Sequence, residues 1–167
     1  MIIDLPSIGA AFGGGYYGGS IAIDGKTYAM IVAPKVDGQK TLAWKDKWSA
    51  TPGALSVNDG FANSQAMDND EHPAAQFCRS LTIGGFDDWY LPASAEHAAI
   101  WANLGPNHTP IAAFQDGAPE AFDGRWYLSS TEFDSDYVWL QRFDVGTQDY
   151  GLKGIPGRCR AVRKVIL

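Results

Sequence analysis

The chain has 167 residues, of which 46% are hydrophobic, 13% aromatic and 19% charged. A single domain of this length buries roughly 70% of its unfolded surface, which is enough to form a core without disulfides or metals. Its 19 glycines make up about one residue in nine, against the usual ~7%, yet glycine and proline together stay below the low-complexity range. These numbers exclude a collagen-like, disordered or disulfide-dense chain and leave an aromatic-rich globular domain.

The net charge of −6 is unevenly distributed along the chain. Five of the thirteen basic residues lie within residues 153–167, which contain no acid, so the rest of the chain is strongly acidic. An acidic body disfavours nucleic-acid binding, because Lys and Arg must neutralise phosphates. The basic segment RCRAVRKVI alternates as a strand does, and we expect its arginines to pair with the acidic body. Since no apolar run approaches the ~20 residues that span a bilayer, we expect no membrane insertion.

The first predicted elements are two strands, SIAI and KTYAMIVA, on either side of Asp24-Gly25, a strong hairpin signal. The preceding GGGYYGG is conformationally permissive. We therefore assign residues 1–19 to a Gly-rich attachment segment and residues 20–167 to a single domain. Residues 34–52, with two tryptophans, are expected to be a loop or an irregular strand pair.

Three helices are predicted in the middle of the chain, near residues 56–67, 73–81 and 94–104. The first opens at the capping-box spacing of Ser56 with Asp59, and the second begins at a proline, which suits a first helical turn. The third is capped by Ser94, carries His97 on its apolar stripe and ends at a Gly-Pro pair.

From residue 125 onward the hydrophobic pattern changes to a period of two. RWYLSS, DYVWLQRF, GTQDYGL and RCRAVRKVI are typical of short strands, and residues 144–146 form a turn signal. Because the helices lie between two groups of strands and do not alternate with them, we predict an α+β fold with a mixed, mostly antiparallel sheet.

Few residues have a spacing that indicates catalysis or metal binding. The three histidines, His72, His97 and His108, show no metal-ligand spacing, and His97 is expected to be a hydrogen-bonded residue of the core or its rim. Ser129-Ser130 lacks the nucleophile-elbow motif. The acidic clusters at residues 68–71, 87–88 and 134–136 lack the order of an EF-hand loop. They are expected to be solvated loops, with 87–88 paired to the basic segment. We predict no cofactor and leave a bound calcium open.

Cys78 and Cys159 lie 81 residues apart, on the second predicted helix and the last predicted strand. A disulfide between them would contribute roughly 4.5 kcal/mol in the chain-entropy model. As free thiols they would behave as small buried hydrophobic residues. The spacing alone does not distinguish these two states.

Three segments carry a resemblance to a known family: CRSLTIGGFDDWYLPASAEH, then WYLSSTEFDSDYVWLQRFDVGTQDY, then RCRAVRKV. Together they resemble the C-terminal domain of the Legionella collagen-like adhesin, the Lcl domain, over residues 78–164. With IGAAFGGGYYGG, YAMIVAP and PGALSVNDGFAN included, the whole chain is similar to the version found in phage tail and tail-fibre proteins. The chain departs from the family pattern at Leu91, His97 and Gln141.

The resemblance implies a C-type-lectin-like α+β fold with two or three helices, whose connecting loops present a ligand surface. It also implies a disulfide between Cys78 and Cys159, which fall at the family's cysteines. Trp139 and Phe143 match core positions of the family, so we expect their face of the strand to point inward.

The turns beside this strand combine aromatic and polar side chains, as sugar and protein recognition surfaces do. The aromatic candidates for ligand contact are Phe133, Tyr137 and Tyr150. The polar candidates are Asp134, Asp136, Asp149 and Lys153.

These observations predict a non-enzymatic phage tail or tail-fibre tip protein that binds a host-surface glycan or outer-membrane protein. Its other partners would be tail subunits, with a homo-oligomer such as a trimer as one arrangement. The expected location is the virion, or the bacterial cell surface if the domain is part of a larger adhesin. Two alternatives are a structural tail subunit and an activity like that of formylglycine-generating enzymes, which need a reactive cysteine pair.

Overall fold

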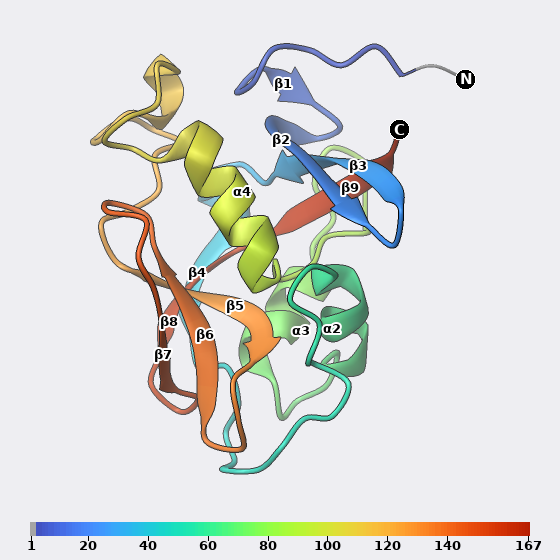
Figure 1. Ribbon diagram of the computed structural model, residues 1–167, viewed down its shortest axis with the longest axis vertical. Coiled ribbons are helices and arrows are strands. Elements are labelled where there is room, and N and C mark those ends of the chain that lie inside the picture. The colour runs from blue at the N-terminus through green and yellow to red at the C-terminus, as the bar shows by residue number, and fades with distance from the viewer. Residues whose placement is uncertain (1–2) are drawn as a thin grey trace.

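The computed structural model describes residues 3–167 and contains, within that range, four α-helices and two sheets (Figure 1). The helices are α1 Lys35–Gly38, α2 Gly60–Ala66, α3 Pro73–Arg79 and α4 Ser94–Leu104, with a short 3-10 turn at Ala112–Phe114. The strands are β1 Ala11–Phe12, β2 Gly15–Ile23, β3 Lys26–Val32, β4 Gln39–Leu42, β5 Trp126–Glu132, β6 Tyr137–Arg142, β7 Gln148–Leu152, β8 Gly157–Arg160 and β9 Val162–Ile166. The predicted α+β class is confirmed.

The strands form two sheets instead of the single sheet that was predicted. One has the order β1-β2-β3-β9 and the other the order β4-β8-β5-β6-β7. Within the described residues the pairs are antiparallel except β5 with β8, which run parallel and meet at Tyr127 and Arg158. The candidate ligand residues lie on β6 and β7, in the β5–β6 turn and directly after β7.

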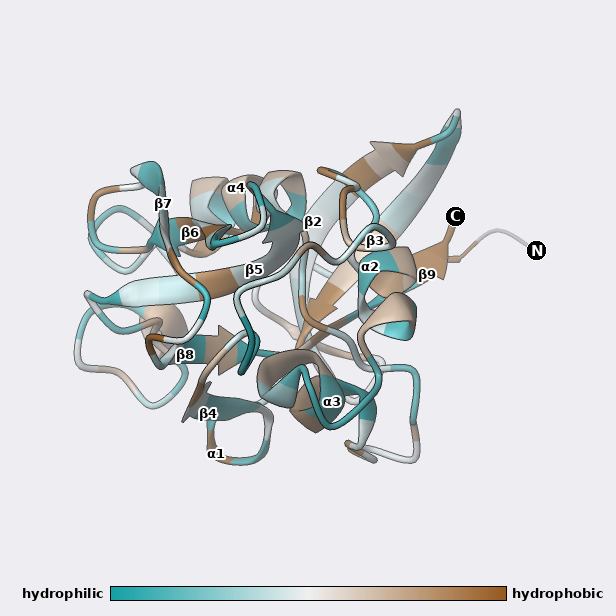
Figure 2. Cartoon of the chain, turned by 90° about the horizontal axis from the view of Figure 1, so that it is seen from below, coloured by the Kyte–Doolittle hydropathy of each residue, from teal (hydrophilic) through white to brown (hydrophobic). Residues whose placement is uncertain are grey.

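The predicted hairpin is the β2–β3 pair. Asp24 and Gly25 have φ angles of 49° and 75°, as the two central residues of a type I′ turn require. Figure 2 shows this turn as a hydrophilic tip. Strand β2 begins at Gly15 and continues across residue 19, so the glycine-rich stretch is part of the sheet. Whether residues 1–19 attach the chain to a neighbour stays a prediction.

The three predicted helices are confirmed as α2, α3 and α4, whereas the single turn of α1 was not predicted. Asp59 caps α2 by accepting a backbone N–H of its first turn, and Pro73 occupies the first turn of α3. The predicted cap of α4 was wrong by one residue, because Ala93 is the N-cap and Ser94 already lies inside the helix. The carboxylate of Glu96 accepts the backbone N–H of Ala93 at 2.8 Å, as the N3 glutamate of a capping box does.

The basic segment RCRAVRKVI does not form one strand, as predicted, but two. Strand β8 belongs to the five-stranded sheet and β9 to the four-stranded sheet. Ala161 lies between them, donating its N–H to Gly38 (2.9 Å) and accepting the N–H of Ala33 (3.0 Å). These two bonds hold the chain where it passes from one sheet to the other.

The predicted pairing of this segment with the acidic body is confirmed. Four basic side chains each bind a carboxylate far away in the sequence. The pairs are Arg158–Asp123 (2.7 Å), Arg160–Glu120 (2.8 Å), Arg163–Asp88 (2.6 Å) and Lys164–Asp59 (2.5 Å).

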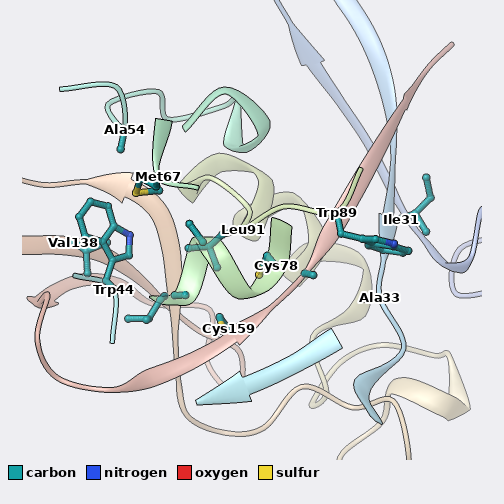
Figure 3. Close-up of a cluster of buried hydrophobic side chains, with 14 residues drawn as sticks. Ile31, Ala33, Trp44, Ala54, Met67, Cys78, Trp89, Leu91, Val138 and Cys159 are labelled. Carbon is teal, nitrogen blue, oxygen red and sulfur yellow. The ribbon is translucent and has the colours of Figure 1, made fainter. Parts of the chain in front are cut away.

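The interior has two apolar clusters. One contains Trp44, Met67, Trp89 and both cysteines and packs α2 and α3 against the five-stranded sheet (Figure 3). The other gathers α4 with Tyr127 and a set of phenylalanines from the following loops and strands. The second cluster packs against the end of β6 near Phe143 and does not include Trp139, so side chains farther along that strand are more exposed.

His97 lies in this second cluster and has an unusual environment. Its side chain is 1% exposed, and its ring meets the ring of Phe143 edge-on at 5.5 Å. Within the described residues neither ring nitrogen has a hydrogen-bond partner. Burial lowers the pKa of His97 to about 3. The predicted core position is therefore confirmed, but the two ring nitrogens lack the hydrogen bonds that were expected.

We expect His97→Leu to stabilise the domain by about 1–3 kcal/mol at pH 7, because it removes two buried nitrogens that lack partners. The unfolded chain protonates this imidazole near pH 6.5, whereas the folded chain resists protonation down to about pH 3. The free energy of unfolding of the native protein should therefore decrease as the pH is lowered from about 6.5 to about 3, and it should decrease less steeply in the variant. Urea unfolding at several pH values measures both effects. The exposed His108→Gln should change neither, and a His97→Leu variant less stable than wild type at pH 7 would contradict the prediction.

Candidate recognition surface

Four aromatic side chains gather on one side of β5, β6 and β7. The rings of Phe133 and Tyr150 stack with centroids 4.4 Å apart and an interplanar angle of 15°. Tyr137 meets Tyr150 edge-on at 5.2 Å, and Trp139 meets Phe133 edge-on at 5.1 Å. Phe133 is 41% exposed and Tyr150 50% exposed. We call these four residues the aromatic surface.

Strand pairing brings these side chains together. Trp139 lies directly opposite Tyr150 in the β6–β7 register, so the two share a face. Phe133 follows β5, and its N–H donates to the carbonyl of Tyr137 at 3.0 Å across the β5–β6 turn. Phe133 and Tyr150 are therefore held together by the backbone of β6, which is hydrogen-bonded to residue 133 on one side and to β7 on the other.

The three predicted acids lie beside the aromatic surface. Asp134 Oδ1 accepts the backbone N–H groups of Asp136 (2.8 Å) and Tyr137 (2.9 Å), which orders the turn. Asp149 Oδ1 accepts the N–H of Tyr150 at 2.8 Å. Asp134 and Asp149 are exposed and Asp136 is half-buried. Asp134 thus supports the turn and faces solvent next to the rings, whereas Asp149 pairs with Leu140 and lies on the opposite face of the strand from Tyr150.

Lys153, predicted as a surface contact, is instead fully buried. Its Nζ lies 3.2 Å from Glu132 Oε1, donates to the carbonyl of Ser49 at 3.0 Å and lies 4.8 Å from the ring centroid of Trp44. Burial lowers the pKa of Lys153. The prediction failed because the loop before residue 52 folds over this side chain, and Lys153 does not belong to the exposed surface.

Trp139 was predicted to point inward and is instead half-exposed. Phe143, on the same face of the sequence pattern, is fully buried as expected. The difference arises because the α4 cluster contains Phe143 but does not extend along the strand to Trp139. The tryptophan therefore contributes to the aromatic surface.

The family model of the Lcl C-terminal domain matches residues 35–163 of the chain. The chain belongs to this family. The matched range begins at α1 and leaves out β1, β2 and β3.

A solved structure of similar fold is a fimbrial protein from Bacteroides ovatus ATCC 8483, with a TM-score of 0.51 and 14% sequence identity. The superposition covers 81% of this chain and 35% of the fimbrial chain. This Lcl protein therefore spans about a third of that protein's length, and at such low identity the likeness concerns the fold alone. No curated protein matches the sequence.

The two cysteines of the Lcl domain are neighbours in the first apolar cluster (Figure 3). Both side chains are fully buried, and this structure has no bond between their sulfurs. Burial, together with contact with Cys159, raises the pKa of Cys78 well above its usual value. A reactive thiol needs a lowered pKa and access to solvent, so this environment disfavours the alternative that requires a reactive pair. The disulfide stays a prediction.

Residues 3–167 contain no group of three or more His, Cys, Asp or Glu side chains placed to hold a metal ion. In the same range no helix is long and apolar enough to cross a membrane.

Proposed function

We propose that this Lcl domain is a non-enzymatic, adhesin-like recognition module that binds a receptor on a bacterial surface through its aromatic surface. The observation that carries the proposal is the exposed Phe133–Tyr150 stack, joined by Tyr137 and Trp139. Membership of the Lcl family supports the adhesin-like role.

The chemistry of this surface suits a glycan. Aromatic rings pack against the C–H faces of sugars, while the neighbouring carboxylate of Asp134 accepts hydrogen bonds from hydroxyl groups. The hydrogen-bonded turn holds the rings in place before binding, which reduces the entropy lost on association. An outer-membrane protein is the second class of receptor that such a surface fits.

The biological setting that we propose is a phage tail or tail-fibre tip, in which the domain contacts the host and assembles with other tail subunits. Its support is the similarity of the N-terminal segments, IGAAFGGGYYGG and YAMIVAP, to phage tail versions of the domain. A homotrimer is one such assembly, and a larger cell-surface adhesin is the other setting.

The double variant Phe133→Ala, Tyr150→Ala is expected to bind at least tenfold more weakly than wild type. It removes the stack but leaves the turn's hydrogen bonds, which come from Asp134 and the backbone. Binding is measured by flow cytometry of fluorescently labelled protein on a panel of bacterial strains and by an array of bacterial surface glycans.

Val145→Ala is the matched control, because Val145 is an exposed apolar residue in the β6–β7 turn, at the other end of β6 from Phe133 and Tyr137. It should bind as wild type does. Equal binding by the double variant and wild type would remove the aromatic surface from the proposal. Wild-type binding no stronger than that of an unrelated protein would favour a purely structural subunit.

A further inference from the structure

A hollow of about 350 Å³ opens on the five-stranded sheet, away from the aromatic surface. Carbon atoms make up most of its lining, with Trp126, Leu128 and Leu140 from the strands and Ile155 from the β7–β8 turn. Ile155 is 61% exposed. The volume of the hollow lies within the range of ligand pockets, and its apolar lining is typical of them.

Two glycines shape the lining of this hollow. A Cβ atom at Gly151 would lie 2.6 Å from Leu140 Cδ1, and a Cβ atom at Gly157 would lie 2.8 Å from Leu128 Cδ2. Real side chains do not approach so closely, so any larger residue at either position would displace the end of a leucine side chain. The glycines therefore let these two leucines pack directly against the backbone.

The hollow and the aromatic surface involve opposite faces of the β6–β7 hairpin. Tyr150 pairs with Trp139, whereas Gly151 pairs with Val138. Because successive residues of a strand alternate between faces, Gly151 and Leu140 lie on the face away from Tyr150. A ligand in the hollow does not depend on the proposed receptor site.

One end of the hollow is cationic. Arg125 and Arg158 line it and also line a second, polar hollow of about 290 Å³ that includes Lys35. Asp123 accepts hydrogen bonds from Lys35 and Arg158, both at 2.7 Å, and Asp116 lines the same hollow. Three cations thus face two carboxylates, in a protein whose net charge is −6.

Arg125 supplies the excess charge. Its side chain is exposed and makes no hydrogen bond or ion pair with any residue in the range 3–167. Its position at the junction of the two hollows places a free guanidinium next to an apolar space. Guanidinium groups bind carboxylates and phosphates through two parallel hydrogen bonds.

We propose that this groove binds a small amphipathic anion, with an alkyl or acyl chain in the hollow and a carboxylate on Arg125. Burial of the chain against Leu128, Leu140 and Trp126 provides the hydrophobic contribution. The excess positive charge selects an anionic head group over a neutral or cationic one. Phosphate-headed chains share the same chemistry and form a separate arm of the test.

The proposal is tested by titrating the whole chain with decanoate, decanol, decyl phosphate and decylamine, followed by calorimetry. Decanoate should bind saturably and at least tenfold more tightly than decanol or decylamine. Arg125→Glu should weaken decanoate at least tenfold while leaving decanol unchanged. Ile155→Asp should weaken both. Each substitution is at an exposed position, so folding is not at risk.

Lys26→Glu and Val145→Asp are the controls, because they make comparable changes, a cation to a glutamate and an aliphatic residue to an aspartate, at exposed positions away from the hollow. Both should bind decanoate as wild type does, as should the Phe133→Ala, Tyr150→Ala variant. Equal binding of decanol and decanoate, an unchanged affinity in Arg125→Glu, or no saturable binding by wild type would each overturn the proposal. Decyl phosphate binding more tightly than decanoate would correct the head group from carboxylate to phosphate.

Discussion

Lys153→Met is expected to destabilise the domain by about 3–5 kcal/mol. The substitution leaves the carboxylate of Glu132, whose side chain is 3% exposed, without its cation. Breaking a buried pair by removing one partner costs far more than an exposed pair is worth, because an ionised group then stays in a medium of low dielectric. The loss is comparable with the whole stability of many domains of this size.

The neighbourhood of Lys153 makes the effect larger than the loss of one pair. Glu132 Oε2 also accepts the N–H of Thr51 at 2.6 Å, and Lys153 Nζ donates to the carbonyl of Ser49. A second buried lysine, Lys45, donates to three oxygens of the same loop. The two lysines therefore hold the loop over the end of the β-sheet, and we expect Lys153→Met to loosen it.

Equilibrium unfolding in urea measures the loss, and Lys47→Met is its matched control. Lys47 pairs with Glu71 at the surface, where both side chains are exposed to solvent, so its removal should change the stability little. The double variant Lys153→Met, Glu132→Leu should recover much of the loss, since no unpaired charge remains. Equal, small losses for the two lysine variants would contradict the assignment of Lys153 to the interior.

Local signals in the sequence predict much of the fold. Asp24-Gly25 predicts a turn whose residues need positive φ, and Pro73 predicts a first helical turn, because both depend on the backbone geometry of single residues. The period-two pattern after residue 125 predicts the strands, because successive side chains of a strand point to opposite faces. These elements are confirmed because their causes lie within a few residues of each other.

The errors have tertiary causes. RCRAVRKVI alternates without a break, and only the bonds of Ala161 with Ala33 and Gly38 divide it between two sheets. Lys153 has a charged side chain in a turn, and only the loop that contains Ser49 buries it. No local pattern contains such partners, which lie about 100 residues or more away in the sequence.

The candidate site was predicted in part. The strand pattern identifies the aromatic residues near both turns, but the β6–β7 register is needed to place Tyr150 beside Trp139. The apolar hollow has a weaker signal still, since Gly151 and Gly157 resemble ordinary turn glycines in the sequence. Their effect depends on Leu128 and Leu140, which only the folded sheet brings near them.

Cys78 and Cys159 are expected to form a disulfide when the protein is made under oxidising conditions, and its reduction should cost roughly 4.5 kcal/mol in the chain-entropy model. The expectation rests on the Lcl resemblance and on the burial of both residues side by side in one apolar cluster. The bond would join α3 to β8 and so close a loop that includes α4, β5, β6 and β7. Reduction should therefore lower the midpoint of thermal unfolding in wild type.

Alkylation in denaturant without reductant, followed by intact-mass measurement, decides the state of the two sulfurs, because denaturant exposes thiols that burial would otherwise protect. Protected sulfurs and a lower unfolding midpoint after reduction are the expected result. The Cys78→Ala, Cys159→Ala variant should unfold at the same temperature with and without reductant, which separates the bond from other effects of the reagent. Two freely alkylated thiols would show that packing alone joins α3 to β8. In that case the loop bearing the aromatic surface would be held to the rest of the domain by the sheet and the buried Lys153–Glu132 pair without a covalent tie.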